Sequence, residues 1–321
     1  MSGLPVSQAY LLADRPEEQR WLVTGLWSEF AVGLIGGEPK CYKSFLALDL
    51  AVAVASGTAC LRRFPVPRPG RVLLYAAEDA LHVVRRRLEG ICAAAAGELK
   101  DLDVHVITAA TLRIDQAADR ERLEYTITQL KPRLLVLDPF VRLHRIDENA
   151  SGEVAPLLAY LRTLQRQHQL AVLVVHHARK SAGRMRAGQA LRGSSEFHAW
   201  GDSNLYLRRS GAELTLTVEH RAAPSPPTIG LELAQRGDAL ALEIIESIAA
   251  PVTAPTSIDE RITTAITAAN RPLAIGELRA LCRVRNGTLY ERLTALTDAG
   301  QIVRTPEGYR LATGTAAPYR S

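Results

Sequence analysis

The sequence predicts an α/β fold in which helices flank a mostly parallel sheet with antiparallel edge strands, followed by a small C-terminal helical domain. Three observations lead to this prediction. Runs of Val, Leu and Ile alternate with helical stretches in the first half of the chain, a pattern typical of buried parallel strands joined by crossover helices. Later strands instead alternate polar and apolar residues. A proline-containing segment then precedes a short, separate helical region.

Composition indicates a cytoplasmic protein with two domains. The chain has 321 residues and 47% of them are hydrophobic, which suits one large and one small domain. We expect no membrane segment and no leader, because no apolar run approaches about 18 residues. The net charge of +5 is a mild indication of a nucleic-acid partner. Free thiols in a reducing compartment are expected at Cys41, Cys60, Cys92 and Cys282.

Each predicted element follows from local patterning. The parallel strands are expected at residues 30–36, 71–76, 104–108, 133–138 and 170–176. The helices between them are expected at residues 44–55, 80–96, 119–130 and 152–168. Antiparallel additions to the sheet edge are expected at residues 205–209, 213–220, 228–233 and 240–245. The predicted regions are an N-terminal segment 1–25, an α/β domain 26–248, a linker 249–257, a small domain 258–313 and a tail 314–321.

A phosphate-binding loop is predicted between the first strand and the first helix, where residues 37–44 read G-E-P-K-C-Y-K-S. Against the pattern G-x-x-x-x-G-K-[ST], Gly37, Lys43 and Ser44 are in register, but Tyr42 replaces the second glycine. Such loops direct backbone N–H groups and a lysine at a polyphosphate, and their hydroxyl holds Mg²⁺. We therefore expect ATP and Mg²⁺, with further contacts from Lys40, Cys41 and Phe45. The alternative is an ordinary strand–turn–helix connection.

Polar residues end three further strands. Glu78 follows the strand at 71–77, where a carboxylate can orient the water that attacks a γ-phosphate, whereas Asp79 could simply cap the next helix. Asp138 ends an apolar strand, which is the place where ATPases with a phosphate-binding loop hold Mg²⁺. His176 and His177 end the next strand and must point to opposite faces, so one could contact the γ-phosphate while the other packs.

Two basic regions are candidates for DNA contact. The segment 178–192 is polar and basic, which suits a DNA backbone, although a solvated surface loop is the alternative. Its candidate residues are Arg179, Lys180, Arg184, Arg186 and Arg192. Residues 258–312 predict three helices and a hairpin, the plan of a winged helix-turn-helix, which binds DNA or, alternatively, protein. Its predicted core is Ile262, Ile266, Leu278, Leu281, Leu289, Leu293, Leu296 and Ile302, and its DNA candidates are Arg283, Arg285, Asn286, Thr288 and Arg292.

The chain resembles the RepA-type plasmid replication helicases, a branch of the RecA-like hexameric ATPases. The matching stretches are G-E-P-K-C-Y-K-S-F-L, V-L-L-Y-A-A-E-D, L-L-V-L-D-P-F, V-L-V-V-H-H-A-R-K and L-R-G-S-S, within roughly residues 26–225. The resemblance implies a RecA-like fold and a homo-oligomeric ring, expected to be a hexamer. It also implies that Glu78 is the catalytic glutamate, Asp138 the metal-side aspartate, His177 the γ-phosphate sensor and Arg87 a neighbour of the nucleotide base.

The chain departs from this family in three places. Tyr42 interrupts the phosphate loop. The family's trans-acting arginine would fall near Asp202, and among the substitutes Arg192, Arg208, Arg209 and Arg221 we favour Arg221, since related rings place basic residues after a late strand. A winged helix is not expected in the compact plasmid helicases.

The sequence therefore predicts a DNA-dependent ATPase that moves on single-stranded DNA and docks on duplex through its C-terminal domain. The alternative is an ATP-sensing regulator or loader that binds DNA without unwinding it. A strand-exchange recombinase ranks last.

Overall fold

The computed structural model describes residues 6–9, 20–177, 196–236, 239–245, 258–269, 271–282, 284 and 286–312. The chain divides into two compact units, Met1–Glu246 and Ser247–Ser321, and each is described by itself. Within the described ranges, no helix has the length and apolarity needed to cross a membrane. All four cysteines are buried and free, as expected.

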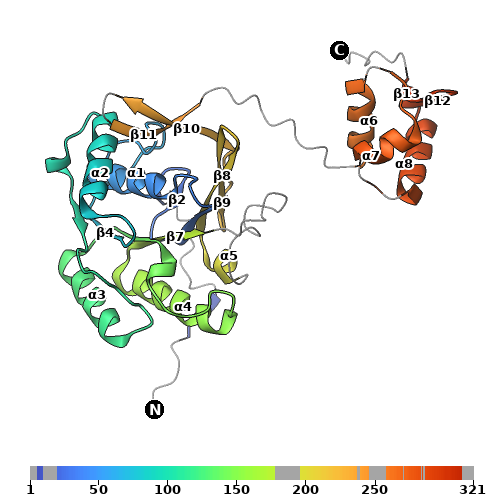
Figure 1. Ribbon diagram of the computed structural model, residues 1–321. Helices are drawn as coiled ribbons and strands as arrows, with labels where there is room; N and C mark the ends of the chain where they lie inside the picture. Colours follow the sequence, from blue (N-terminus) through green and yellow to red (C-terminus); the bar gives the residue numbers. More distant parts are fainter. Residues whose placement is uncertain are drawn as a thin grey trace. The chain divides into compact units, whose positions relative to one another are not determined.

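The first unit is built on a sheet whose described strands number nine, in the order β11-β10-β9-β8-β3-β7-β6-β4-β5 (Figure 1). Its parallel strands are β3 (Val32–Gly37), β4 (Val72–Ala76), β5 (Val104–Val106), β6 (Leu134–Asp138), β7 (Ala171–His177) and β8 (Ser203–Ser210). The antiparallel edge is β9 (Glu213–His220), β10 (Ile229–Arg236) and β11 (Ala239–Ile244), and a small hairpin pairs β1 (Trp21–Val23) with β2 (Trp27–Ser28). The predicted α/β class, with a mostly parallel sheet and antiparallel edge strands, is confirmed.

One expectation about the sheet was wrong. The strand predicted at residues 205–209 was expected to be antiparallel, but β8 runs parallel to β3 and only its other neighbour β9 is antiparallel. The physical reason lies in the connection from β7, residues 178–202, which is long enough to return the chain to the opposite end of the sheet. The carboxyl end of β8 therefore lies at the same edge as the carboxyl end of β3.

Helices cover both faces of this sheet (Figure 1). On one face α1 (Lys43–Ser56) and α2 (Leu81–Ala94) share a buried cluster with alternate strand residues such as Val72 and Leu74. On the other face α3 (Ala117–Leu130), α4 (Ser151–His168) and α5 (Glu196–Trp200) share a second cluster with Leu73 and Tyr75. Short 3-10 helices, η2 (Leu99–Asp101) and η3 (Phe140–Arg142), follow α2 and β6.

Helix α1 is buried over most of its length because it is apolar on nearly all sides. It ends at Gly57, whose left-handed φ of 79° allows its N–H to bond Ala53 O at 2.8 Å. Its one buried acid, Asp49, accepts hydrogen bonds from Leu61 N and Arg62 Nη1, at 2.7 and 2.8 Å. These contacts tie α1 to the loop that follows it.

The second unit contains α6 (Ile258–Ala269), α7 (Ile275–Cys282), α8 (Asn286–Asp298) and a hairpin of β12 (Ile302–Thr305) and β13 (Gly308–Leu311). An isolated bridge joins Leu273 to Tyr309. The predicted core residues are buried except Leu281, which is 59% exposed. Cys282 is buried in the core instead of Leu281, because it lies four residues after the buried Leu278 on the same helix face.

Candidate nucleotide site

The turn between β3 and α1 has the geometry of a phosphate loop although Tyr42 replaces a glycine. A Cβ on Gly37 would lie 2.4 Å from Leu207 O and 2.6 Å from Cys41 Sγ, so only glycine fits there. Tyr42 is the residue before α1, with φ 64° and ψ 28°. This left-handed conformation costs a residue with a Cβ roughly 1–2 kcal/mol, and glycine would adopt it freely. The tyrosine therefore holds a left-handed backbone conformation that favours glycine.

The first backbone N–H groups of α1 have no acceptor inside the helix. Tyr42 forms no side-chain cap, and the first helical bond runs from Leu46 N to Tyr42 O at 3.2 Å. The N–H groups of residues 43–45 precede that bond and have no acceptor within the helix. A helix N-terminus with free donors and a positive dipole end favours an anion.

Lys43 is directed into the loop. It is only 5% exposed, and its Nζ donates to Gly37 O at 3.0 Å and to Glu38 O at 2.8 Å. Burial lowers the pKa of Lys43, which the charges of Asp138 and Glu78 partly oppose. An anion in the loop would stabilise the charged ammonium and replace its carbonyl partners.

Asp138 and Ser44 form a pair of hard oxygen groups beside Lys43. Ser44 donates a hydrogen bond to the Asp138 carboxylate, and burial raises the pKa of Asp138 to about 6. In the part of the chain that the structure describes, no group of three or more His, Cys, Asp or Glu side chains could hold a metal ion by itself. A magnesium ion is commonly held by one or two protein oxygens together with substrate phosphates, so this donor set fits Mg²⁺ that arrives with a nucleotide.

Glu78 lines the site, and Arg142 Nε donates to Glu78 Oε1 at 3.0 Å. Asp79 does not cap α2, because the cap position is Ala80 and the Asp79 carboxylate pairs with Arg87. The Arg87 guanidinium also lies 5.1 Å from the ring centroid of Phe45. Arg142 was not predicted from the sequence, although its place four residues after Asp138, in D-P-F-V-R, puts it close to a predicted site residue.

The two histidines at the end of β7 point to opposite faces, as expected. His176 is 1% exposed and its ring stacks on Phe197, with centroids 4.1 Å apart. His177 lines the pocket, and its Nδ1 is buried without a hydrogen-bond partner among the described residues. Burial, aided by the charge of Lys43, lowers the pKa of His177, so the neutral ring can donate an N–H to a bound group at neutral pH.

These groups surround a cavity of about 360 Å³ at the carboxyl ends of β3, β4, β6 and β7. Its lining includes most of the predicted nucleotide residues, namely Lys40, Tyr42, Lys43, Ser44, Phe45, Glu78, Arg87, Asp138 and His177. Cys41 does not line it, since the side chain is fully buried beneath the loop and burial raises the pKa of its thiol. Gly37 contributes through its lack of a Cβ, which allows β8 to approach the loop.

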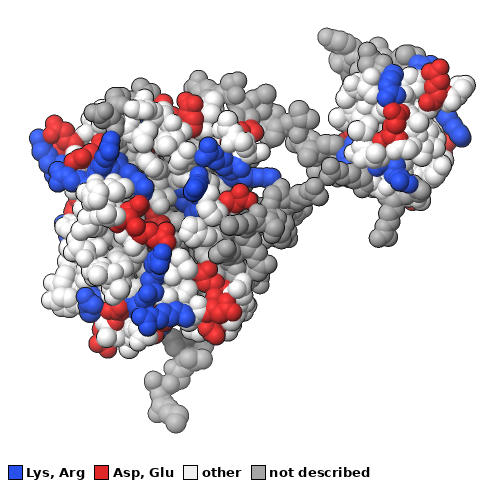
Figure 2. All heavy atoms as spheres, in the orientation of Figure 1, with Lys and Arg blue, Asp and Glu red and all other residues white. Residues whose placement is uncertain are grey.

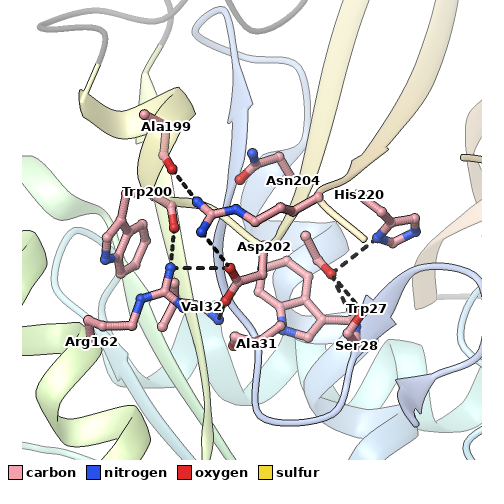
Figure 3. A network of polar contacts seen from close by, with 12 residues as sticks. Trp27, Ser28, Ala31, Val32, Arg162, Ala199, Trp200, Asp202, Asn204 and His220 are labelled. Atoms are coloured by element: carbon pink, nitrogen blue, oxygen red, sulfur yellow. Dashed lines mark hydrogen bonds and ion pairs between the residues drawn. The ribbon is translucent and has the colours of Figure 1, made fainter. Parts of the chain in front are cut away.

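Arg221 lies far from this cavity, at the end of the sheet where β3 begins. Its Nη1 lies 3.4 Å from Asp202 Oδ1 and its Nη2 donates to Ala199 O. Asp202 also pairs with Arg162 (Figure 3), and its N–H donates to Val32 O at 2.7 Å. The structure therefore places Arg221 in a network that joins α4, α5 and three strands, and not beside the phosphate loop of its own chain.

The predicted DNA residues are only partly covered by the structure. Arg179, Lys180, Arg184, Arg186, Arg192, Arg283 and Arg285 lie outside the described residues, as does the side chain of Asn286. Thr288 lies half-buried in α8. Arg292 is held by Asp259 of α6, with Nε 2.7 Å from Oδ1, which gives it a structural contact within the second unit.

A family model and solved structures are similar to this chain. A family model described as AAA domain matches residues 3–183. A KaiC-like protein from the hyperthermophilic archaeon Pyrococcus horikoshii OT3 is 14% identical, with a TM-score of 0.50 over 70% of this chain and 93% of that chain. A RadB recombinase is 17% identical, with a TM-score of 0.49 over 68% of this chain and 92% of that chain. The family match spans more than half of the sequence and the order of strands around the phosphate loop is RecA-like, so the chain belongs to the AAA domain family and its first unit is a P-loop ATPase domain with a RecA-like fold.

Proposed function

We propose that this protein is a DNA-dependent ATPase of the RepA-like branch, which binds Mg²⁺·ATP in the cavity beside α1 and acts as a homo-oligomeric ring on single-stranded DNA. The observation that carries the proposal is the convergence of Lys43, Ser44, Glu78, Asp138 and His177 on one cavity. These residues end or follow four different strands of the sheet, and each has a chemical type suited to phosphoryl transfer.

Binding of the triphosphate is assigned to the loop. The N–H groups of residues 43–45 donate to phosphate oxygens. Lys43 Nζ leaves the carbonyl oxygens of Gly37 and Glu38 and pairs with the phosphate oxygens instead. Ser44 and Asp138 would hold the magnesium ion, which when bound neutralises charge on the phosphates. Arg87 and Phe45 form the side of the cavity where the nucleotide base would lie.

Hydrolysis is assigned to Glu78 and His177. Glu78 orients a water and accepts its proton, and the Arg142 contact fixes one of its two carboxylate oxygens. His177 donates an N–H to the γ-phosphate. Such positioned groups act without covalent chemistry, because phosphoryl transfer depends on orientation and charge stabilisation.

In the proposed ring, Arg221 of one subunit acts at the nucleotide site of its neighbour. Arg221 lies at the end of the sheet opposite its own cavity, which suits a residue that serves a neighbouring subunit. A trans-acting arginine contributes about 10³–10⁵ in rate where such residues have been studied. To act in this way, Arg221 must leave Asp202, and Arg162 remains to neutralise that carboxylate.

The DNA contacts are assigned to two regions. Acidic and basic side chains intermingle on the visible face of the first unit, and this face has no extended basic surface (Figure 2). The proposed DNA contacts therefore rest on the two regions alone. The segment 178–192 follows His177 directly and carries five basic residues, which suits contact with single-stranded DNA beside the nucleotide. The second unit is assigned as a winged helix for duplex DNA, supported by its three helices, its hairpin and the exposed Arg304 and Arg310 on that hairpin.

A second candidate is an ATP-sensing regulator or loader that binds DNA without unwinding it. The Arg142–Glu78 pair bears on this candidate, because an arginine that stays on Glu78 when nucleotide is bound would keep the base occupied. Strand displacement on forked DNA separates the two. Unwinding supports the first, and ATP-dependent duplex binding without unwinding supports the second.

The proposal is tested by ATPase activity with and without single-stranded DNA, on a sample whose mass in solution is known. We expect an oligomer whose turnover rises with DNA, complete loss of turnover in Lys43→Ala, and nucleotide binding without turnover in Glu78→Gln. Lys43→Ala with unchanged hydrolysis would remove this cavity from the reaction. A monomer that is insensitive to DNA would contradict the ring.

A further inference from the structure

We propose that Arg209 is a positioning residue for the phosphate loop and that it holds Tyr42 in the left-handed conformation which the loop requires. This inference rests on the proposed nucleotide-binding function of the cavity. It concerns a contact within one subunit, and it explains how the loop tolerates an aromatic residue in place of glycine.

Arg209 reaches the loop because β8 lies beside β3. Gly37 is the register partner of Leu207, so Arg209 follows two residues beyond the level at which the loop begins. Its guanidinium carbon lies 5.6 Å from the ring centroid of Tyr42, and its Nη1 donates to the Tyr42 hydroxyl at 3.4 Å. A cation over an aromatic face attracts the ring in addition to the hydrogen bond.

Both partners are fixed from a second side. Arg209 Nε donates to Gly211 O at 3.2 Å, in the turn between β8 and β9, so the guanidinium is oriented by its own hairpin. The Tyr42 ring meets Phe45 edge to face, with centroids 6.2 Å apart and planes at 83°. Tyr42 is therefore held between the first turn of α1 and the end of β8.

The conformation of Tyr42 decides where the loop donors point. Tyr42 directly precedes the N–H groups of residues 43–45, and its φ of 64° is unfavourable for a side chain with a Cβ. Relaxation of Tyr42 to an ordinary conformation would turn these N–H groups away from the cavity. The contact with Arg209 opposes that relaxation, whereas a glycine at position 42 would need no such support.

The test is a double-mutant cycle on the Kd of Mg²⁺·ADP, measured by calorimetric titration of the full chain. Arg209→Ala should weaken binding roughly fivefold when residue 42 is tyrosine. In the Tyr42→Gly background the same Arg209→Ala change should alter the Kd by less than about twofold, whatever the affinity of that background. Arg209→Lys should fall between, because an ammonium keeps the charge but loses the planar fork.

Arg208→Ala is the matched control, since it removes an arginine from the adjacent position of the same strand. Its effect on the Kd should be the same in both backgrounds. An Arg209→Ala effect of equal size in both backgrounds would overturn the inference and assign Arg209 to the phosphates or to general charge. The inference would also fail if Arg209→Ala lowered the melting temperature and left the Kd unchanged.

The proposed function has its own readout in the same experiment. Wild-type binding that disappears in Lys43→Ala supports the cavity as the nucleotide site, independently of the cycle. A wild-type chain that binds no Mg²⁺·ADP overturns the proposed function, and the inference with it. Binding that depends on Lys43 but shows no coupling between residues 42 and 209 overturns the inference alone.

Discussion

At the scale of single residues, the contact between Glu78 and Arg142 has the most direct consequence for turnover. The two side chains are half exposed, and Arg142 Nε engages one carboxylate oxygen of Glu78. The arginine can orient the base for catalysis or keep it occupied. The direction of the change after its removal therefore separates the two candidate functions.

We expect Arg142→Ala to lower kcat about tenfold, because a base that loses its orientation contributes less to proton transfer. The Kd of the nucleotide should change little, since Arg142 does not line the cavity. Steady-state kinetics together with a nucleotide titration checks both values, and Arg142→Lys should restore part of the loss. A faster Arg142→Ala enzyme would show that the pair restrains the base, which favours the regulator or loader.

His220 gives a prediction for the pH dependence of stability. Its Nε2 lies 3.2 Å from Gly25 O and its Nδ1 lies 3.2 Å from Ser203 Oγ. Burial lowers the pKa of His220, which the hydrogen bond to Gly25 partly opposes. Protons therefore bind preferentially to the unfolded chain. The stability that His220 contributes is present above the unfolded pKa of about 6.5 and is lost as the pH falls through the lower folded pKa.

We expect His220→Gln to reduce the fall in melting temperature between about pH 7 and about pH 5. His177 acts in the same direction, so part of the fall should remain. Thermal denaturation across this pH range measures the effect, with His82→Gln as a control that removes an exposed histidine. An unchanged or steeper fall in His220→Gln would contradict the assignment.

At the scale of elements, Asp49 shows how α1 is anchored. The carboxylate is 2% exposed and holds Leu61 N and Arg62 Nη1, and Arg62 also donates to Leu242 O of β11. Leu61 and Arg62 both have left-handed φ values, 50° and 58°. One buried acid therefore fixes an unfavourable turn and joins α1 to the antiparallel edge.

We expect Asp49→Ala to reduce the free energy of unfolding by about 2–4 kcal/mol, because Leu61 N–H and the Arg62 guanidinium lose their acceptor. Asp49→Asn should lose less, since the amide oxygen still accepts from Leu61. Urea denaturation measures both. Asp103→Ala is the control, because it breaks the more exposed pair with Arg71 and should cost much less. A loss in Asp49→Ala as small as the control would contradict this role.

The elements also show how far the sequence predicts this structure. Buried strands and the polar residues at their ends were recognisable, because apolar runs and strand-end acids are local patterns. The direction of β8 was not recognisable, because it depends on the end of the sheet at which the chain re-enters after residues 178–202. The partners of Glu78 and Arg209 were equally unpredictable, because each contact joins two elements that are distant in sequence.

At the scale of the whole molecule, the chain contains a RecA-like P-loop unit and a second unit with its own core. The proposed division of labour gives nucleotide and single-stranded DNA to the first unit and duplex DNA to the second. Arg292 forms an ion pair with Asp259, which links α8 to α6 within the second unit. Duplex binding should therefore depend more on Arg304 and Arg310 of the hairpin than on Arg292.

The most direct measurement is a crystal structure of the protein with a non-hydrolysable ATP analogue and Mg²⁺. We expect the triphosphate to occupy the loop, Lys43 Nζ to have left the carbonyls of Gly37 and Glu38 for phosphate oxygens, and Ser44 to face the metal. A cavity that stays empty, or that the phenol of Tyr42 fills, would contradict it.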